Sequence, residues 1–266
     1  MAADMTRPWK GAVDPFRIYG NLYFVGTEPA STHLIDTGDG LILLDPGYQQ
    51  SLYLVLDNIR RLGFDPRDIK KIIHSHGHYD HLGATRAIVE MTGARTYLGE
   101  DDLEFARETH AYVGLSGIGS CTFEPDVLLK DGDTVTLGNT TILCVHTPGH
   151  SKGTVSFFFD AYGEEGALRC GMFGGVGFNT MRRDFLDKNG LDDSCRYAFL
   201  RSVERMMQED VDIFLGNHVG NNDTLGKGAM VREGKGNPFL HTNREWHAFL
   251  DTLKERMVTL IASEKE

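Results

Sequence analysis

The sequence contains few cysteines, and they are not paired. Four thiols are spread over 266 residues without a Cys-x-x-Cys motif: Cys121, Cys144, Cys170 and Cys195. A disulfide-stabilised scaffold would carry a denser set, and a zinc ribbon would need paired thiols. We therefore predict that the four cysteines are core residues.

Long hydrophobic runs are also missing. No uninterrupted apolar stretch approaches the roughly 18 residues of a transmembrane helix, so no membrane partner is expected. The first ten residues lack the apolar segment of a secretory signal. The chain as it stands is expected to be cytoplasmic, and it would be periplasmic or secreted if a leader had been removed.

Positive charge is scarce. The chain has 27 Lys and Arg against 38 Asp and Glu, a net charge of −11, and none of its Lys/Arg runs exceeds two residues. Nucleic-acid binding is disfavoured, because a polyanion needs a basic stripe. A small molecule is the expected partner, and the sequence contains no signal for an oligomeric state.

The order of predicted elements favours an α/β fold in one domain over residues 1–266. Residues 32–37 and 41–44 surround an Asp-Gly turn, and residues 134–137 and 141–145 surround Gly138-Asn139, so both pairs predict hairpins. Apolar residues at helical spacing predict helices over 51–62, 83–91, 197–207 and 246–257. Strands in runs followed by helices indicate packed sheets with helices on both outer faces.

The most informative segment runs from His74 to Gly83. It holds four imidazoles and a carboxylate within eight positions, directly after an apolar strand. Imidazole and carboxylate are preferred ligands of zinc and similar ions. His76 and His78 alternate about a glycine and project to the same side in extended backbone. Asp80 and His81 lie just beyond, where a turn can direct them at a second point.

Two later histidines extend the pattern. His150 follows Pro148-Gly149, so the chain has just turned after a strand and can present this side chain to a cavity. His218 ends an apolar strand between glycines. Alone, His218 would be weak evidence for a metal ligand, but the first two segments leave a second metal ion one ligand short.

The pattern His76-x-His78-x-Asp80-His81 resembles the H-x-H-x-D-H signature of the metallo-β-lactamase superfamily. The resemblance looks closer to the subclass with three histidines on the first zinc and Asp-His-His on the second (subclass B3). It implies a four-layer αβ/βα sandwich of two mixed β-sheets flanked by helices, with two Zn²⁺ per chain at one edge. By the same resemblance, His76, His78 and His150 would hold the first zinc, and Asp80, His81 and His218 the second. Asp45 matches an aspartate that supports the metal loop.

One departure concerns the residues after Phe173. Many superfamily members carry a bridging aspartate here, whereas this chain reads Gly174-Gly175. Its absence agrees with the lactamase branch, but that branch usually has a serine near Gly175. Asn179 and Thr180 are the nearest polar residues that could substitute for it in binding substrate.

The function predicted from this resemblance is hydrolysis of the β-lactam amide ring by a zinc-generated hydroxide, with Asp80 as the catalytic side chain. The first alternative is hydrolysis of a lactone, ester or thioester at the same site. The second is a metal-binding or redox protein without hydrolysis. The segment from Glu104 to Gly119, with Phe105, His110, Tyr112 and Leu115, is expected either to contact substrate or to close the core.

Overall fold

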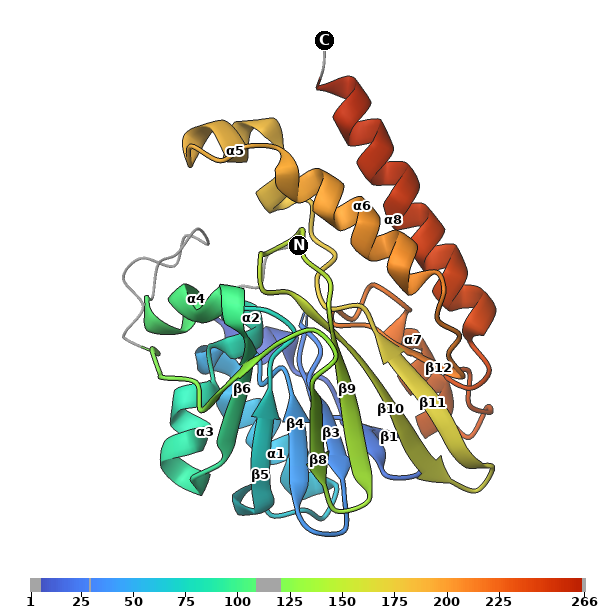
Figure 1. Ribbon diagram of the computed structural model, residues 1–266. Coiled ribbons are helices and arrows are strands. Elements are labelled where there is room, and N and C mark those ends of the chain that lie inside the picture. Colours follow the sequence, from blue (N-terminus) through green and yellow to red (C-terminus); the bar gives the residue numbers. More distant parts are fainter. Residues whose placement is uncertain (1–5, 29, 109–120, 265–266) are drawn as a thin grey trace.

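The computed structural model describes residues 6–28, 30–108 and 121–264. Within these residues the strands form two mixed sheets (Figure 1). The larger runs in the order β1 (Phe16–Tyr19), β2 (Leu22–Phe24), β3 (His33–Asp36), β4 (Leu41–Leu44), β5 (Ile69–Ile73), β6 (Arg95–Gly99), β7 (Val127–Leu129). The smaller runs in the order β12 (Ile213–Leu215), β11 (Gly166–Met172), β10 (Val155–Gly163), β9 (Thr140–His146), β8 (Thr134–Leu137).

Helices cover the outer face of each sheet. In chain order the described helices are α1 (Leu52–Arg61), α2 (Tyr79–Leu82), α3 (Thr85–Thr92), α4 (Leu103–Arg107), α5 (Arg183–Lys188), α6 (Ser194–Met206), α7 (Thr224–Arg232) and α8 (Asn243–Ser263). In Figure 1, α1 and α3 lie against the larger sheet, and α6 and α8 lie together over the smaller one. None of the described helices combines the length and the apolar character that a bilayer crossing requires.

Three apolar clusters separate the four layers. Alternation along each strand sends side chains to opposite faces, so Phe157 and Phe159 of β10 enter the cluster between the sheets. Phe158, between them, packs outward with Phe199 of α6 and Trp246 of α8. On the other side, a third cluster joins the outer face of the larger sheet to α1 and α3. The predicted four-layer αβ/βα sandwich is confirmed.

Both predicted hairpins form, as β3–β4 and β8–β9. The parallel strands β6 and β7 and the helix α7 lacked a periodic signal in the sequence. In α7 the reason is visible, because two glycines interrupt its apolar spacing. One of them, Gly228, lies against the ring of Phe16, where a Cβ atom would come within 2.3 Å of Phe16 Cε1. That helix is therefore specified by close packing and not by its own sequence pattern.

The end of α8 is joined to α6 by a partly buried ion pair. The Arg196 guanidinium is almost fully buried, donates to the Met181 carbonyl over 2.7 Å and pairs with Glu264. Burial alone would raise the pKa of Glu264, but Arg196 and the Arg183 amide outweigh it and lower that pKa. The pair therefore contributes stability above the ordinary glutamate pKa and loses it as the pH falls through the lowered value.

We expect Glu264→Gln to lower the free energy of unfolding by about 2 kcal/mol at pH 7, because Arg196 keeps its burial but loses its counter-charge. Urea unfolding at pH 7 and at pH 3 measures the effect. The gap from the unsubstituted protein should be smaller at pH 3, because Glu264 is then protonated in the unfolded chain and the ion pair contributes less to stability. Glu90→Gln, which breaks the exposed pair with Arg86, is the control and should cost under about 0.5 kcal/mol. An equal gap at both pH values would contradict this account.

Candidate metal centre

The loop after β5 and the short helix α2 carry four of the predicted ligands. Side chains in the loops that follow the carboxyl ends of parallel strands converge on a common crevice, and the loop after β5 follows such a strand end. His76 and His78 lie in the loop, and His78 directly precedes the first turn of α2. Asp80 and His81 lie within that turn, and their ligand atoms and that of His76 lie within 4.8 Å of one another.

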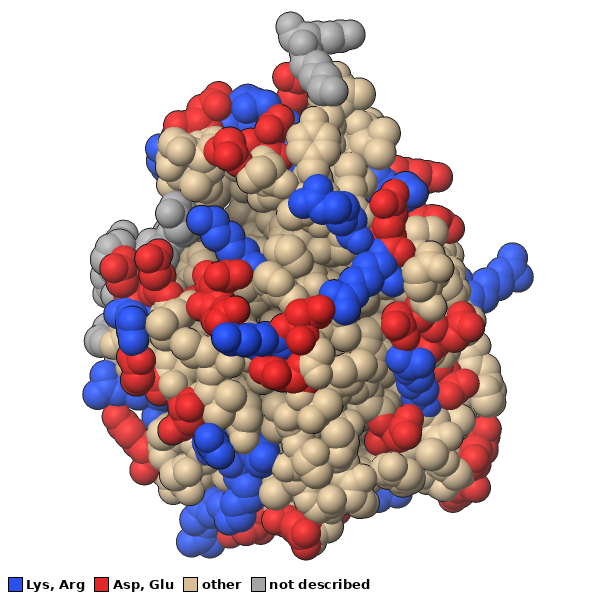
Figure 2. Space-filling model, viewed as in Figure 1, with Lys and Arg blue, Asp and Glu red and all other residues tan. Residues whose placement is uncertain are grey.

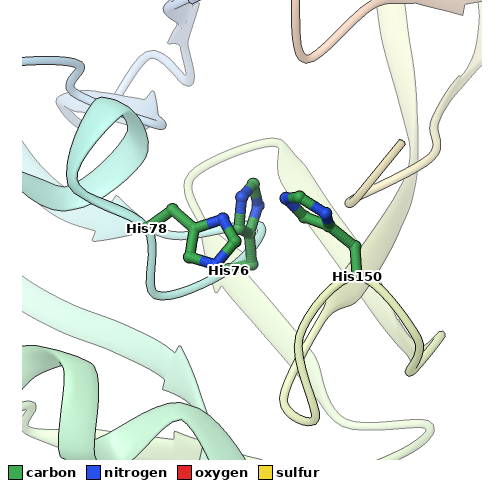
Figure 3. A group of neighbouring side chains, drawn as sticks. All are labelled: His76, His78 and His150. Atoms are coloured by element: carbon green, nitrogen blue, oxygen red, sulfur yellow. The ribbon is translucent and has the colours of Figure 1, made fainter. Parts of the chain in front are cut away.

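His150 joins the two loop histidines in a first cluster. Figure 3 shows the rings of His76, His78 and His150 turned toward one another, and their ligand nitrogens lie within 4.8 Å of each other. The ring centroids of His78 and His150 are 4.5 Å apart, and each is 4.7 Å from that of His76. All three side chains are buried, and His76 Nε2 has no hydrogen-bond partner. A buried nitrogen without a partner is costly, and a divalent cation would satisfy it.

The first cluster is electrically suited to a cation. Burial lowers the pKa of His78 to about 4, and burial together with the neighbouring imidazoles lowers the pKa of His76 and His150 well below the ordinary value. The rings are therefore neutral at pH 7, which is the form of histidine that binds a metal. His150 Nδ1 donates to the Gly177 carbonyl over 2.7 Å, which leaves Nε2 as its free lone pair.

Asp80, His81 and His218 form a second cluster beside the first. His81 Nε2 lies 3.3 Å from His218 Nε2, and Asp80 Oδ2 lies 3.5 Å from His81 Nε2 and 3.6 Å from His218 Nε2. Ligands of a tetrahedral zinc ion are about 3.4 Å apart, so these three atoms have the spacing of one face of that tetrahedron. The clusters adjoin, because the rings of His76 and His81 are only 4.1 Å apart between centroids.

Charge in the second cluster is concentrated about His81. Burial would lower the pKa of His81, but the carboxylates of Asp80 and Asp45 outweigh it and raise that pKa to about 10. The same histidine, with His218, holds the pKa of Asp80 well below its usual value although burial opposes the shift. Positive charge is therefore favoured between the carboxylates of Asp80 and Asp45, and a metal ion there would displace the His81 proton.

Asp45 supports both clusters from behind. It ends β4 in a left-handed conformation with φ of 50°, and its side chain is buried. One oxygen accepts from His81 Nδ1 at 2.8 Å and from the Ser75 hydroxyl at 2.6 Å, and the other accepts from the Ser75 amide at 2.7 Å. Ser75 Oγ in turn lies 3.0 Å from His76 Nδ1. Asp45 thus orients His81 directly and His76 through Ser75.

We expect Asp45→Asn to weaken zinc binding by about 10- to 100-fold, because the amide cannot accept from all three donors. Competition with a chromophoric chelator measures the affinity. Asp36→Asn is the control, because the Asp36 carboxylate accepts from the amide of Gly38 in an exposed turn. Unchanged zinc affinity in Asp45→Asn would show that Asp45 does not support the metal ligands.

The three residues predicted to contact substrate differ in exposure and in their contacts. Gly175 is buried, and a Cβ atom there would lie 2.8 Å from His150 Cβ, so a serine could not enter without moving His150. Asn179 is exposed. Thr180 is buried and donates its hydroxyl to the His150 carbonyl over 2.7 Å, while it also lines the neighbouring pocket.

A pocket of about 310 Å³ opens beside the first cluster, with His78 and His150 in its wall. Its apolar lining comes from Phe105, Phe185 and Leu191. Its charged residues are Asp101, Glu104, Lys152 and Asp192. Figure 2 shows this face hollowed below α5 and beside α6, with side chains of both signs around the hollow. Phe105 therefore reaches the pocket, whereas His110, Tyr112 and Leu115 lie outside the described residues.

One buried side chain at this site carried no signal in the sequence. Asp102 is fully buried and bonds to the loops of both His76–His78 and His150. It closes the acidic run Glu100–Asp102, in which nothing distinguishes it from its neighbours. Only its burial in the folded chain marks it.

A family model for the metallo-beta-lactamase superfamily matches residues 25–215. The chain belongs to this superfamily. Among solved structures, the native FEZ-1 metallo-β-lactamase from Legionella gormanii is 25% identical with a TM-score of 0.86, and the match covers 96% of this chain and 98% of that one. BJP-1, a subclass B3 metallo-β-lactamase of Bradyrhizobium japonicum, is 27% identical with a TM-score of 0.84 over 98% of both chains.

Among curated relatives of the superfamily, the N-acyl homoserine lactonase AttM from Agrobacterium fabrum is 29% identical over 154 residues. That match covers 51% of this chain and 57% of the lactonase. The structural likeness to subclass B3 β-lactamases thus extends over nearly the whole chain, whereas the sequence likeness to the lactonase spans little more than half of either protein.

Proposed function

We propose that this superfamily hydrolase binds two Zn²⁺ per chain and opens the amide bond of a β-lactam ring. One observation carries the proposal. Six side chains of ligand type converge in two adjoining clusters, and two histidines of the first cluster line a pocket. Zinc fits the mixture of imidazole and carboxylate donors in these clusters.

The two clusters define which residues would hold each ion. His76, His78 and His150 would bind the first, and Asp80, His81 and His218 the second. When bound, zinc lowers the pKa of a coordinated water to near neutrality and polarises a carbonyl group. The protein contributes the preset positions of the ligands, which Asp45 maintains through His81 and Ser75.

Asp80 is the side chain that we propose to act directly in the reaction. Its carboxylate contacts His81 and His218 through one oxygen and keeps 19% of its surface exposed. Its low pKa keeps it ionised, so it can accept a hydrogen bond from the attacking water and orient it. The same charge balances the second cation.

The proposed hydrolysis uses no covalent intermediate on the protein. The two buried serines nearest the ligands serve other purposes, because Ser75 donates its hydroxyl to Asp45 and Ser151 donates its hydroxyl to Asp102. Cys195 lines the pocket, but burial raises the pKa of its thiol and keeps it protonated. Intact-protein mass spectrometry during turnover is expected to find no acylated chain.

A second candidate function is hydrolysis of a lactone, ester or thioester at the same centre. The close approach of Gly175 to His150 favours it, because the hydroxyl that the lactamase branch usually offers near this position is missing and has no room. Similarity to a lactonase supports it as well. Both functions rest on the same metal chemistry and differ in the substrate held by the pocket.

Turnover of nitrocefin, a penicillin and a carbapenem by the zinc-loaded protein, beside a panel of lactones and thioesters, tests the proposal. We expect β-lactams to have the higher kcat/KM. A kcat/KM at least ten times higher for any lactone or thioester would replace the first function by the second. Inactivity toward every substrate in the presence of two bound zinc ions would refute both.

A further inference from the structure

Asp102 is a buried carboxylate at the junction of a 3-10 turn, Glu100–Asp102, and α4. Its side chain accepts three short hydrogen bonds and has no exposed surface. Oδ2 accepts from the Gly77 amide at 2.8 Å and from the Ser151 hydroxyl at 2.6 Å, and Oδ1 accepts from the Gly153 amide at 2.7 Å. Burying a charged group is costly, and each of these three hydrogen bonds offsets part of the cost of burying the Asp102 carboxylate.

The three donors belong to the two chain segments that supply the first cluster. Gly77 lies between His76 and His78. Ser151 directly follows His150, and Gly153 comes two residues later. One carboxylate therefore joins the backbone of the loop after β5 to the backbone of the loop after β9. In the sequence these loops are more than 70 residues apart, and Asp102 belongs to neither.

Close packing fixes this junction. A Cβ atom on Gly153 would lie 2.5 Å from the Asp102 amide, and one on Gly77 would lie 2.6 Å from Phe105 Cβ in the next turn of α4. The ring of Phe105 packs edge-on against His78, with 5.4 Å between centroids. Ser151 Oγ also lies 2.7 Å from Thr154 Oγ1, which extends the network into the turn before β10. The Asp102 carboxylate thus lies where the loop after β5, the loop after β9 and the start of α4 are in close contact. The packing leaves little room for any of these segments to shift.

We propose that Asp102 is a positioning residue that sets the spacing of His76, His78 and His150 before any metal binds. Asp102 acts on the backbone that carries the imidazoles, whereas Asp45 contacts the ring of His81 and reaches His76 through Ser75. The two carboxylates thereby position different parts of the centre. Asp102 positions the three-histidine cluster, and Asp45 chiefly positions the second cluster. The proposal rests on the metal centre of the proposed function and not on the identity of the substrate.

Asp102→Asn tests this division, because an amide in that place must turn its NH₂ toward at least one of the three donors. We measure zinc affinity by chelator competition in two backgrounds. His218→Ala leaves the first cluster intact, and His150→Ala leaves the second intact. In the first background Asp102→Asn should weaken zinc binding by about 10- to 100-fold, and in the second the change should stay within about threefold.

Two further variants separate positioning from general stability. Asp126→Asn is the matched control, because Asp126 accepts from the amide and hydroxyl of Thr96 at 2.8 and 2.9 Å but touches neither ligand loop. It should lower the melting temperature without changing either zinc affinity. Ser151→Ala removes one donor and leaves the Asp102 carboxylate, so it should weaken zinc binding at the first cluster alone, by about 3- to 10-fold. This variant tests the proposal if Asp102→Asn does not fold.

Unchanged zinc affinity at the first cluster in Asp102→Asn or, should that variant not fold, in Ser151→Ala would overturn the proposal. Equal losses at both clusters would overturn it too, as would a loss in Asp126→Asn as large as in Asp102→Asn. These outcomes are distinct from failure of the proposed function. A protein that binds two zinc ions but hydrolyses none of the substrates would refute the β-lactamase and lactonase proposals while leaving this one standing.

Discussion

Removal of the metal with a chelator is expected to lower hydrolysis at least about 10³-fold, because metal ions supply several kcal/mol of transition-state stabilisation. The six ligand side chains remain after removal, but none is a nucleophile of the required strength. Initial rates after treatment with EDTA and after re-addition of zinc measure the effect, and zinc should restore the rate.

The control is the chelator-treated protein compared by circular dichroism with the zinc-loaded protein. The core clusters do not involve the metal ligands, so the secondary structure should be retained. Substantial hydrolysis that persists after the zinc content has fallen to near zero would exclude the metal-based chemistry. Restoration of the hydrolysis rate by iron but not by zinc would keep the metal-based hydrolysis and contradict the assignment of zinc.

Asp80→Asn should produce the second large effect, a fall in kcat of about 10³-fold together with a drop from two bound zinc ions to one. The amide removes the negative charge that faces His81 and His218, and it removes the acceptor that we assign to the attacking water. Steady-state kinetics and zinc analysis of the dialysed variant measure the two consequences.

Asp251→Asn, an exposed position on α8, is the matched control and should leave kcat and zinc content unchanged. Asp80→Asn with two retained zinc ions and a normal kcat would exclude both roles of Asp80. Two retained ions with a reduced kcat would separate them, because the carboxylate would then act on water without being needed to hold the ion.

The charges around the pocket bear on which substrates to compare first. Asp101, Glu104 and Asp192 outnumber Lys152 along its lining. These acidic side chains would oppose an anionic substrate, whereas bound zinc would attract it, and salt would screen both effects. The substrate panel is therefore most informative when each anionic compound is paired with a neutral analogue and measured at two ionic strengths.

Much of the fold could be predicted from local patterns, because alternation and turn chemistry act over a few residues. The Asp-Gly turn between β3 and β4 and the Gly138-Asn139 turn between β8 and β9 are examples. The strands β6 and β7 and the helix α7 escaped the same analysis. These elements depend on packing against segments that are distant in the sequence, as the contact between Gly228 of α7 and Phe16 of β1 illustrates.

The sequence by itself determined which side chains of ligand type lie together after β5. The spacing of His76, His78, Asp80 and His81 specifies ligand types and their division into two directions, because a strand end and a helical turn have fixed geometries. Only the tertiary structure decided which distant residues complete and hold the clusters. It brought His150 and His218 to the loop, closed the space at Gly175, and placed Asp102 between two loops, since burial and hydrogen bonding between remote segments arise only when the layers pack.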